Sequence, residues 1–351
     1  MEQSYLKGRG AQINPPNRFH NLVYDEGTQH LLAEDSGQVP TKYIEVYPKT
    51  IVNKVESPDL PFNYSMNPYQ GCEHGCVYCY ARNTHQYWGY SAGLEFEQTI
   101  LYKKNAAALL EKQLKSPRWK ADPIMMSGNT DCYQPAESKL GITRELLKVL
   151  LRYRHPVGII TKNNLILRDL DLLKELNQYN LVKVVITVTT LDDTLRQFLE
   201  PRASSIPGRF KTIEALAKAG IPVNAMISPI IPGLNEHELM PLAKKISTLG
   251  ANDIFYSLVR LNGEIGRIFE DWLSRVYPDR KDKILSKIKS CHSGELGDSR
   301  FGKRMSGEGN IAKIIKDQYK LAKKIYFKNV TSVPFNLDLH DGFKTGQLKL
   351  F

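Results

Sequence analysis

The sequence has few cysteines and no long apolar run. Its 351 residues include only five cysteines. That is too few for a disulfide scaffold, and an odd number cannot be fully paired. No stretch approaches the roughly 20 apolar residues needed to cross a bilayer, and the opening segment MEQSYLKGRGAQINPPNRFH has no apolar signal-peptide core. These absences predict a cytoplasmic protein with reduced thiols and no membrane partner.

Acidic residues are also under-represented. The 48 Lys and Arg residues against 37 Asp and Glu residues give a formal charge of +11, which favours an anionic partner such as nucleic acid. No helix-turn-helix, RNA-binding or zinc-finger pattern accompanies this excess, and many of the lysines are typical of a solvated helix surface. Clusters suited to phosphate contacts occur at Arg152 and Arg154, at Lys281 and Lys283, and at Arg300, Lys303 and Arg304.

A regular alternation of short apolar runs and amphipathic segments begins at Pro61. The hydrophobic content of 42% is sufficient for a full-sized core. Near-continuous apolar runs are typical of parallel strands covered on both faces, and repeated strand–helix–strand order predicts right-handed βαβ units in a doubly wound sheet or a barrel. The expected strands are 62–68, 124–128, 157–161, 182–190, 223–231 and 253–261, and the helices between them include 143–153, 168–176, 209–220 and 236–250.

The same pattern divides the chain into three expected regions. Residues 1–60 are an irregular N-terminal arm with one strand-like run at 43–47, residues 61–262 form the α/β domain, and residues 263–351 form a helical cap and tail. Ligands of parallel α/β folds bind at the carboxyl ends of the strands. The residues that follow each apolar run are therefore the candidates for a binding site.

Three of the five cysteines stand together in NPYQGCEHGCVYCYAR. Cys72, Cys76 and Cys79 have the spacing Cys-x3-Cys-x2-Cys, and clustered thiolates suit zinc or an iron–sulfur cluster. A structural zinc site normally has four protein ligands, and here no second cysteine pair is present. A fourth ligand would have to come from His74, His85, Cys132 or Cys291. The other interpretation is a 4Fe–4S cluster with one iron left open for a substrate or cofactor.

The motif Cys-x3-Cys-x-aromatic-Cys, with Tyr78 before the last cysteine, resembles the cluster motif of the radical S-adenosylmethionine (SAM) superfamily. The segments CVYCYAR, MSGNTDCYQPAE, ITKNNLILRDLDLL, AGIPVNAMISPIIPGLNEHE and GRGAQINPPNRF resemble the branch that contains spore photoproduct lyase, over residues 5–330. The resemblance implies a partial (β/α)6 barrel, a 4Fe–4S cluster on the three cysteines, bound SAM, and an electron donor such as flavodoxin or ferredoxin. It also implies reductive cleavage of SAM to a 5′-deoxyadenosyl radical that abstracts hydrogen from a substrate.

The resemblance also suggests which residues serve the cofactor. Tyr78 and the strand-end residues would line the SAM pocket, and Lys162 would face the cofactor carboxylate. The turn after the second strand lacks the family's acidic residue, so Asp131 or a backbone carbonyl would replace it. Each assignment has a structural alternative. The turn after the second strand could be an ordinary turn, Lys162 could be a solvated loop lysine, and Thr187 and Thr189 could simply be good strand formers. The strand-end residues are Ser127, Gly128, Asn129, Thr130, Lys162, Thr187 and Thr189.

Cys132 is a candidate hydrogen-atom donor, because the lyase has a cysteine in a comparable region, and Tyr133 lies beside it. The register differs from that of the lyase, and the alternative is a small residue packed under the loop. A nucleic-acid base lesion is the leading expected substrate. The alternatives are radical modification of a protein, peptide or metabolite, and a zinc-bound nucleic-acid-binding protein without catalysis.

Overall fold

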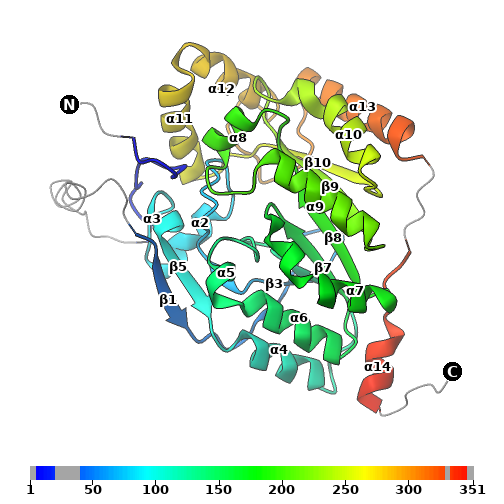
Figure 1. Cartoon of the computed structure of the whole chain (residues 1–351). Coiled ribbons are helices and arrows are strands. Elements are labelled where there is room, and N and C mark those ends of the chain that lie inside the picture. Colours follow the sequence, from blue (N-terminus) through cyan, green and yellow to red (C-terminus); the bar gives the residue numbers. More distant parts are fainter. Residues whose placement is uncertain (1–4, 20–39, 329–332, 346–351) are drawn as a thin grey trace.

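A seven-stranded sheet forms the centre of the protein (Figure 1). The structure, a computed structural model, describes residues 5–19, 40–328 and 333–345. The strand order is β10-β9-β8-β7-β6-β3-β2. Neighbouring strands from β3 to β10 pair in parallel, and β2 pairs antiparallel with β3 at the edge. The strands are β2 (Val52–Lys54), β3 (Tyr64–Met66), β6 (Ile124–Met126), β7 (Val157–Thr161), β8 (Val182–Thr187), β9 (Val223–Ile230) and β10 (Ile254–Leu258).

Each of the six apolar runs expected from the sequence contains one parallel strand, which confirms the expected α/β fold with its partial barrel of parallel strands. The strands are buried because helices follow them along the chain and bury apolar faces in the same core, apart from the helix 193–199, whose Leu195 and Leu199 pack in a second cluster. These helices are α4 (Ala106–Lys115), α5 (Glu137–Leu140), α6 (Ile142–Arg152), α7 (Leu170–Gln178), α8 (Asp193–Leu199), α9 (Ile206–Lys218) and α10 (Leu239–Thr248). Short 3-10 segments are η1 (Gln86–Trp88), η2 (Asn164–Asp169), η3 (Glu236–Glu238) and η4 (Pro278–Arg280).

A smaller three-stranded sheet, of order β1-β5-β4, positions the cysteine motif. Strand β4 (Tyr69–Gln70) leads directly into the motif, and helices α2 (Arg82–His85) and α3 (Glu95–Gln98) follow it. Strand β1 (Lys42–Val46) pairs in parallel with β5 (Thr99–Lys103). Strands β1 and β2 both lie in the expected N-terminal arm, so this arm contributes a strand to each sheet. The division of the chain into three regions stays a prediction.

The C-terminal region is helical, as expected. It contains α11 (Glu264–Val276), α12 (Lys281–Ser290), α13 (Gly309–Tyr326) and α14 (Asp338–Thr345), and Figure 1 shows α11 and α12 together at one end of the molecule. Trp272 of α11 and Ile284 of α12 share an apolar cluster with Val77 of the cysteine motif. The cap therefore packs directly on the motif. Among the described residues, no helix is both long and apolar enough to span a membrane.

Candidate functional site

The three cysteines of the motif lie on one loop between β4 and α2. Cys72 and Cys76 are each only 6% exposed, Cys79 is half-buried, and all three are free thiols. Burial raises the pKa of each thiol. Charge on Asp131 raises the pKa of Cys72 further, and so do the other two thiolates. The three sulfur atoms are thus near enough to influence one another, in a site that is almost dry.

The loop owes its shape to close backbone packing against the segment GRGA near the amino terminus. Gly75 adopts a φ of +69°, and a Cβ added at Gly10 would lie 1.7 Å from the Gly75 carbonyl oxygen. The buried carboxylate of Glu97 accepts hydrogen bonds from Gly10 N at 3.0 Å and from the next backbone N–H at 2.8 Å. Arg82 pairs with Glu97 at 2.5 Å and donates from Nε to Cys76 O at 2.8 Å. The loop is therefore held without using its thiols.

Two candidate fourth ligands of a zinc site, His74 and Cys291, make other contacts. Zinc gathers four ligands within about 2.0–2.3 Å of one ion, whereas a 4Fe–4S cluster takes its thiolates on different irons. Among the described residues, no group of three or more His, Cys, Asp or Glu side chains could hold one metal ion. His74, one proposed fourth ligand, instead lies 3.5 Å from Asp131 and 3.2 Å from Asn163 Nδ2. Cys291, another proposed fourth ligand, is buried in the main core.

A buried network of charges adjoins the cysteine loop. Glu200, which follows α8, is fully buried and pairs with the fully buried Arg209 of α9. It also accepts hydrogen bonds from the Tyr78 hydroxyl and, at 2.6 Å, from Thr189 Oγ1. Lys162 Nζ lies 3.5 Å from it. Burial acts to raise the pKa of Glu200, but the charges of Arg209 and Lys162 and the hydroxyl hydrogen bonds hold it well below its ordinary value.

This network carries two cations and one carboxylate. Arg209 is held by the backbone as well, donating to Ser204 O at 2.9 Å and to Thr187 O at 3.1 Å. Among the described residues, the one carboxylate that Lys162 pairs with is Glu200, at the longer distance of 3.5 Å, and the lysine side chain is 17% exposed. Its ammonium lies 5.7 Å from the centroid of the Tyr78 ring. The excess positive charge therefore resides on Lys162, next to the cysteine loop, where it can meet an anionic group.

The two strand-end threonines lie at and just beyond the end of β8. The strand ends at Thr187, and Thr189 lies two residues past it. Both side chains are buried, and the Thr189 hydroxyl is already bonded to Glu200. Their contact with SAM stays a prediction, as do those of Tyr78 and Lys162.

The turn after β6 is held by internal hydrogen bonds. Ser127 has a φ of +73°, and its Oγ accepts a bond from Cys132 N at 2.8 Å. The Asn129 side chain donates to Gln70 Oε1 at 2.9 Å and to Thr84 Oγ1 at 3.1 Å, and Thr130 Oγ1 donates to Tyr69 O at 2.7 Å. Gly128 O accepts a bond from the Tyr80 hydroxyl at 2.7 Å. These bonds join the turn to β4 and α2, and its role in SAM binding stays a prediction.

Cys132 and Tyr133 are both fully buried in the main core. The Tyr133 hydroxyl donates to Asp169 Oδ2 at 3.2 Å. Neither side chain is exposed to solvent in this conformation, and the chemistry predicted for them stays a prediction. Asp131, just before them, accepts bonds from Thr161 Oγ1 and Lys162 N, both at 2.8 Å. Asp131 therefore joins the turn after β6 to the end of β7, and its contact with His74 at 3.5 Å connects both to the cysteine loop.

Glu97, Glu200 and Arg209 are the residues of this site that sequence reasoning missed. They stand in helices or just after one, and none belongs to a motif. Each is fully buried, and a buried charge needs a partner. A charged residue at a position that helical periodicity assigns to the core could have drawn attention to them. Periodicity does not, however, identify the oppositely charged residue that pairs with it.

Comparisons with known proteins agree with this geometry. The family model of the Radical SAM superfamily matches residues 66–246. An uncharacterised protein of Mycobacterium tuberculosis is 33% identical over 238 residues, 67% of this chain and 70% of that protein. An uncharacterised protein of Methanocaldococcus jannaschii is 31% identical over 245 residues, 70% of this chain and 87% of that protein. The structure of spore photoproduct lyase complexed with dinucleoside spore photoproduct is similar in fold, with a TM-score of 0.61 and 16% identity over 82% of this chain and 80% of that chain.

Proposed function

Because the chain belongs to the radical SAM superfamily, whose members are enzymes that use a 4Fe–4S cluster and SAM, we propose that Cys72, Cys76 and Cys79 hold that cluster. Three thiolates bind three irons, and the fourth iron remains for SAM. The observation that carries the proposal is a loop of three free thiols, fixed by its backbone and set against the strand ends. When bound, the cluster and SAM supply a 5′-deoxyadenosyl radical that abstracts a hydrogen atom from the substrate.

The chain's own residues prepare the cofactor site electrostatically. Lys162 supplies a positive charge for the SAM carboxylate, because Glu200 is already neutralised by Arg209 and holds Lys162 only at 3.5 Å. A compact ammonium acts in such a site as a point charge. The Tyr78 hydroxyl, bonded to Glu200, fixes the residue between Cys76 and Cys79. Burial of the loop under α11 and α12 excludes water from the thiols.

We extend the proposal to the substrate, a nucleic-acid base. Two observations support it: the fold is similar to that of a lyase whose structure holds a dinucleoside spore photoproduct, and the formal charge of +11 suits a polyanion. In this proposal an external one-electron donor such as flavodoxin or ferredoxin reduces the cluster.

The cluster assignment is tested by anaerobic reconstitution followed by iron analysis. The wild-type protein is expected to bind about four irons per chain, as one cubane requires, and after reduction to convert SAM to 5′-deoxyadenosine and methionine. Cys76→Ala should lose both properties. Cys291→Ala is the matched control, because this thiol is equally buried but lies in the main core. Retained SAM cleavage in Cys76→Ala, or stoichiometric zinc in the wild-type protein, would refute the assignment.

The substrate class is tested with oligonucleotides that contain thymine dimers and deuterated thymine bases. The proposal expects deuterium in the 5′-deoxyadenosine that is formed, because the hydrogen abstracted from the substrate ends there. If SAM is cleaved but no deuterium is transferred, a thymine-base substrate is wrong while the superfamily chemistry stands. Transfer from a protein or metabolite fraction instead would assign the enzyme to that other class of substrate.

A further inference from the structure

An exposed aromatic ring lies directly beside the cysteine loop. Tyr80 follows Cys79, and it is 51% exposed. Its hydroxyl donates to Gly128 O at 2.7 Å, so the side chain bridges the cysteine loop and the turn after β6. A tyrosine anchored by its hydroxyl keeps a fixed ring orientation. This ring therefore offers a rigid planar surface next to the reacting centre of the proposed enzyme.

Arg260 lies two residues past the last parallel strand, β10. Its segment is joined to the end of the cysteine motif by a hydrogen bond from Asn83 Nδ2 to Asn262 O at 2.7 Å, and the charge of Arg260 acts on Tyr80. Its neighbours Val259 and Leu261 are buried, and backbone bonds from Leu258 N to Met305 O and from Leu261 N to Leu296 O hold the segment in place. Within the described residues, its guanidinium makes no hydrogen bond or ion pair. Burial lowers the pKa of Arg260, and the charge of the nearby Arg304 lowers it further.

The loop 300–306 completes this part of the surface. Arg304 donates to Asp59 Oδ2 at 2.6 Å and lies 4.7 Å from the centroid of the Phe301 ring, which is 58% exposed. The sequence marked this loop as a basic cluster, but three carboxylates balance its three cations: Arg304 pairs with Asp59, Arg300 with Asp298 and Glu308, and Lys303 with Glu308. We call Tyr80, Arg260, Phe301 and Arg304 the rim. Arg260 is the rim cation that forms no ion pair among the described residues, although the charges of Asp59 and Asp298 also act on it.

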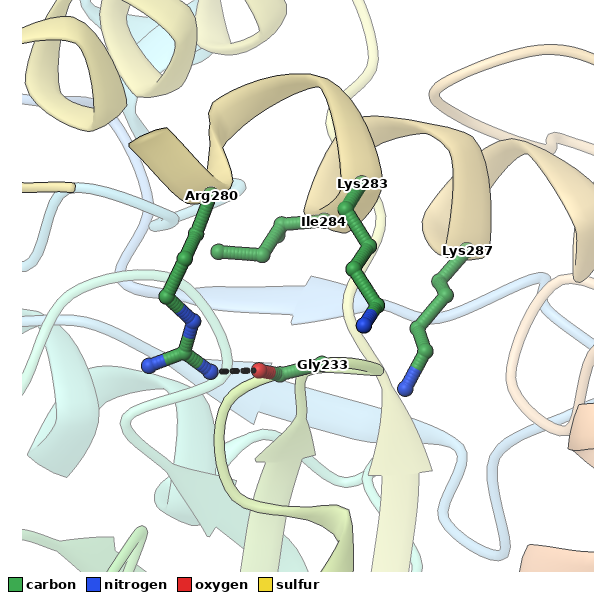
Figure 2. A pocket seen from close by; sticks show the side chains of 5 residues that line it. All are labelled: Gly233, Arg280, Lys283, Ile284 and Lys287. Atoms are coloured by element: carbon green, nitrogen blue, oxygen red, sulfur yellow. Dashed lines mark hydrogen bonds between the residues drawn. The ribbon is translucent and has the colours of Figure 1, made fainter. Parts of the chain in front are cut away.

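A second basic site on the cap differs from the rim. Figure 2 shows Arg280, Lys283 and Lys287 extending from the α12 region toward the loop at Gly233, where they line a cavity of about 310 Å³. Arg280 donates to Gly233 O at 2.6 Å, and Lys287 pairs with Glu236 at 3.1 Å. In the part of the chain that the structure describes, no aromatic residue lines this cavity. Among its described lining residues, this cavity has basic side chains but no aromatic ring for a base to stack on. It therefore serves as a control site for the binding measurements below.

We propose that the rim binds a nucleotide unit of the substrate strand, with the base stacked on Tyr80 and a phosphate bound by Arg260. The inference rests on the proposed function and assigns its substrate contacts. An exposed ring beside an unpaired guanidinium matches the two parts of a nucleotide, since single strands are bound by stacking of bases and by charge on the backbone. An arginine also suits phosphate through paired N–H donors. An acidic peptide would contact the Arg260 guanidinium but would leave the Tyr80 ring unused.

The test measures fluorescence anisotropy of a labelled single-stranded oligothymidylate, twelve nucleotides long, with the anaerobic holoenzyme over a range of salt concentrations. Arg260→Ala and Tyr80→Leu are each expected to weaken binding by about tenfold, the effect of losing one good phosphate or stacking contact. Arg260→Ala should also reduce the salt slope by roughly one. Arg260→Lys, which keeps the charge, should recover most of the binding, and Arg280→Ala should bind like the wild-type protein.

The inference is overturned if Arg260→Ala binds like Arg280→Ala, if the wild-type protein does not bind the oligonucleotide, or if polyglutamate displaces the oligonucleotide as well as unlabelled strand does. Its failure is distinguishable from that of the proposed function. Deuterium transfer from an oligonucleotide combined with rim-independent binding overturns this inference alone. Rim-dependent binding without any deuterium transfer overturns the proposed reaction and leaves the nucleotide site standing.

Discussion

Glu200→Gln removes one negative charge from a place where neither Glu200 nor Arg209 reaches water. The guanidinium keeps its bonds to Ser204 O and Thr187 O but loses its carboxylate. The amide of glutamine still offers an oxygen to the Thr189 hydroxyl, so the lost charge dominates the effect. Removing one partner of a buried ion pair costs about 3–5 kcal/mol, because the other charge stays buried and uncompensated. The free energy of unfolding should fall by that amount.

Two further variants show whether charge is the cause. Lys162→Met removes a side chain that is partly exposed and 3.5 Å from Glu200, and the carboxylate keeps Arg209. Its cost should stay near 1 kcal/mol or below, as for a partly solvated pair. The double variant Glu200→Gln/Arg209→Met removes both buried charges and should recover most of the stability lost in the single variant, since no uncompensated buried charge is left.

The measurement is urea unfolding of the metal-free protein under reducing, anaerobic conditions, followed by far-ultraviolet circular dichroism. The metal-free form is used because a bound cluster would add its own stabilisation to the folded state. A Glu200→Gln protein within about 1 kcal/mol of the wild type would refute the reasoning. The same conclusion would follow if the double variant were as unstable as the single one, because burial of an unpaired Arg209 could not then be the cause.

Two further predictions concern the cysteine loop and its surroundings. In Gly10→Ala the new Cβ would lie 1.7 Å from the Gly75 carbonyl oxygen and would displace the cysteine loop. Because metal affinity depends on a preformed site, we expect at least about a twofold loss of iron per chain after reconstitution. Gly208→Ala, whose Cβ meets only side-chain atoms at 3.2 Å or more, is the control, and equal iron in both would contradict the prediction. Burial lowers the pKa of His85 from 6.5 to about 4. As the pH falls, the histidine is therefore protonated in the unfolded state before it is protonated in the folded state. The free energy of unfolding should fall by about 3 kcal/mol between pH 7 and pH 4. Urea unfolding across this range checks it, and an unchanged slope in His85→Phe would show that another group is responsible.

The parallel strands were predictable because each is a compact run of apolar residues. The runs at 157–161 and 223–231 contain β7 and β9 almost to the residue. The small sheet was not predictable in the same way. Strand β4 has two residues, and it exists only because it pairs with β5 after the chain has folded. Helix α4 was missed although its alanine, leucine and lysine residues favour a helix.

The sequence by itself determined the parallel α/β fold and the cysteine motif, because both are written in neighbouring residues: periodic apolar runs and the spacing of Cys72, Cys76 and Cys79. Only the tertiary structure decided which charges meet. Glu97 binds a backbone N–H that is 87 residues away in the chain. Arg260 comes close to Arg304 of loop 300–306, and among the described residues its guanidinium forms no ion pair. Local patterns record which residues are buried, whereas the pairing of buried charges depends on distances through space that exist only in the folded chain.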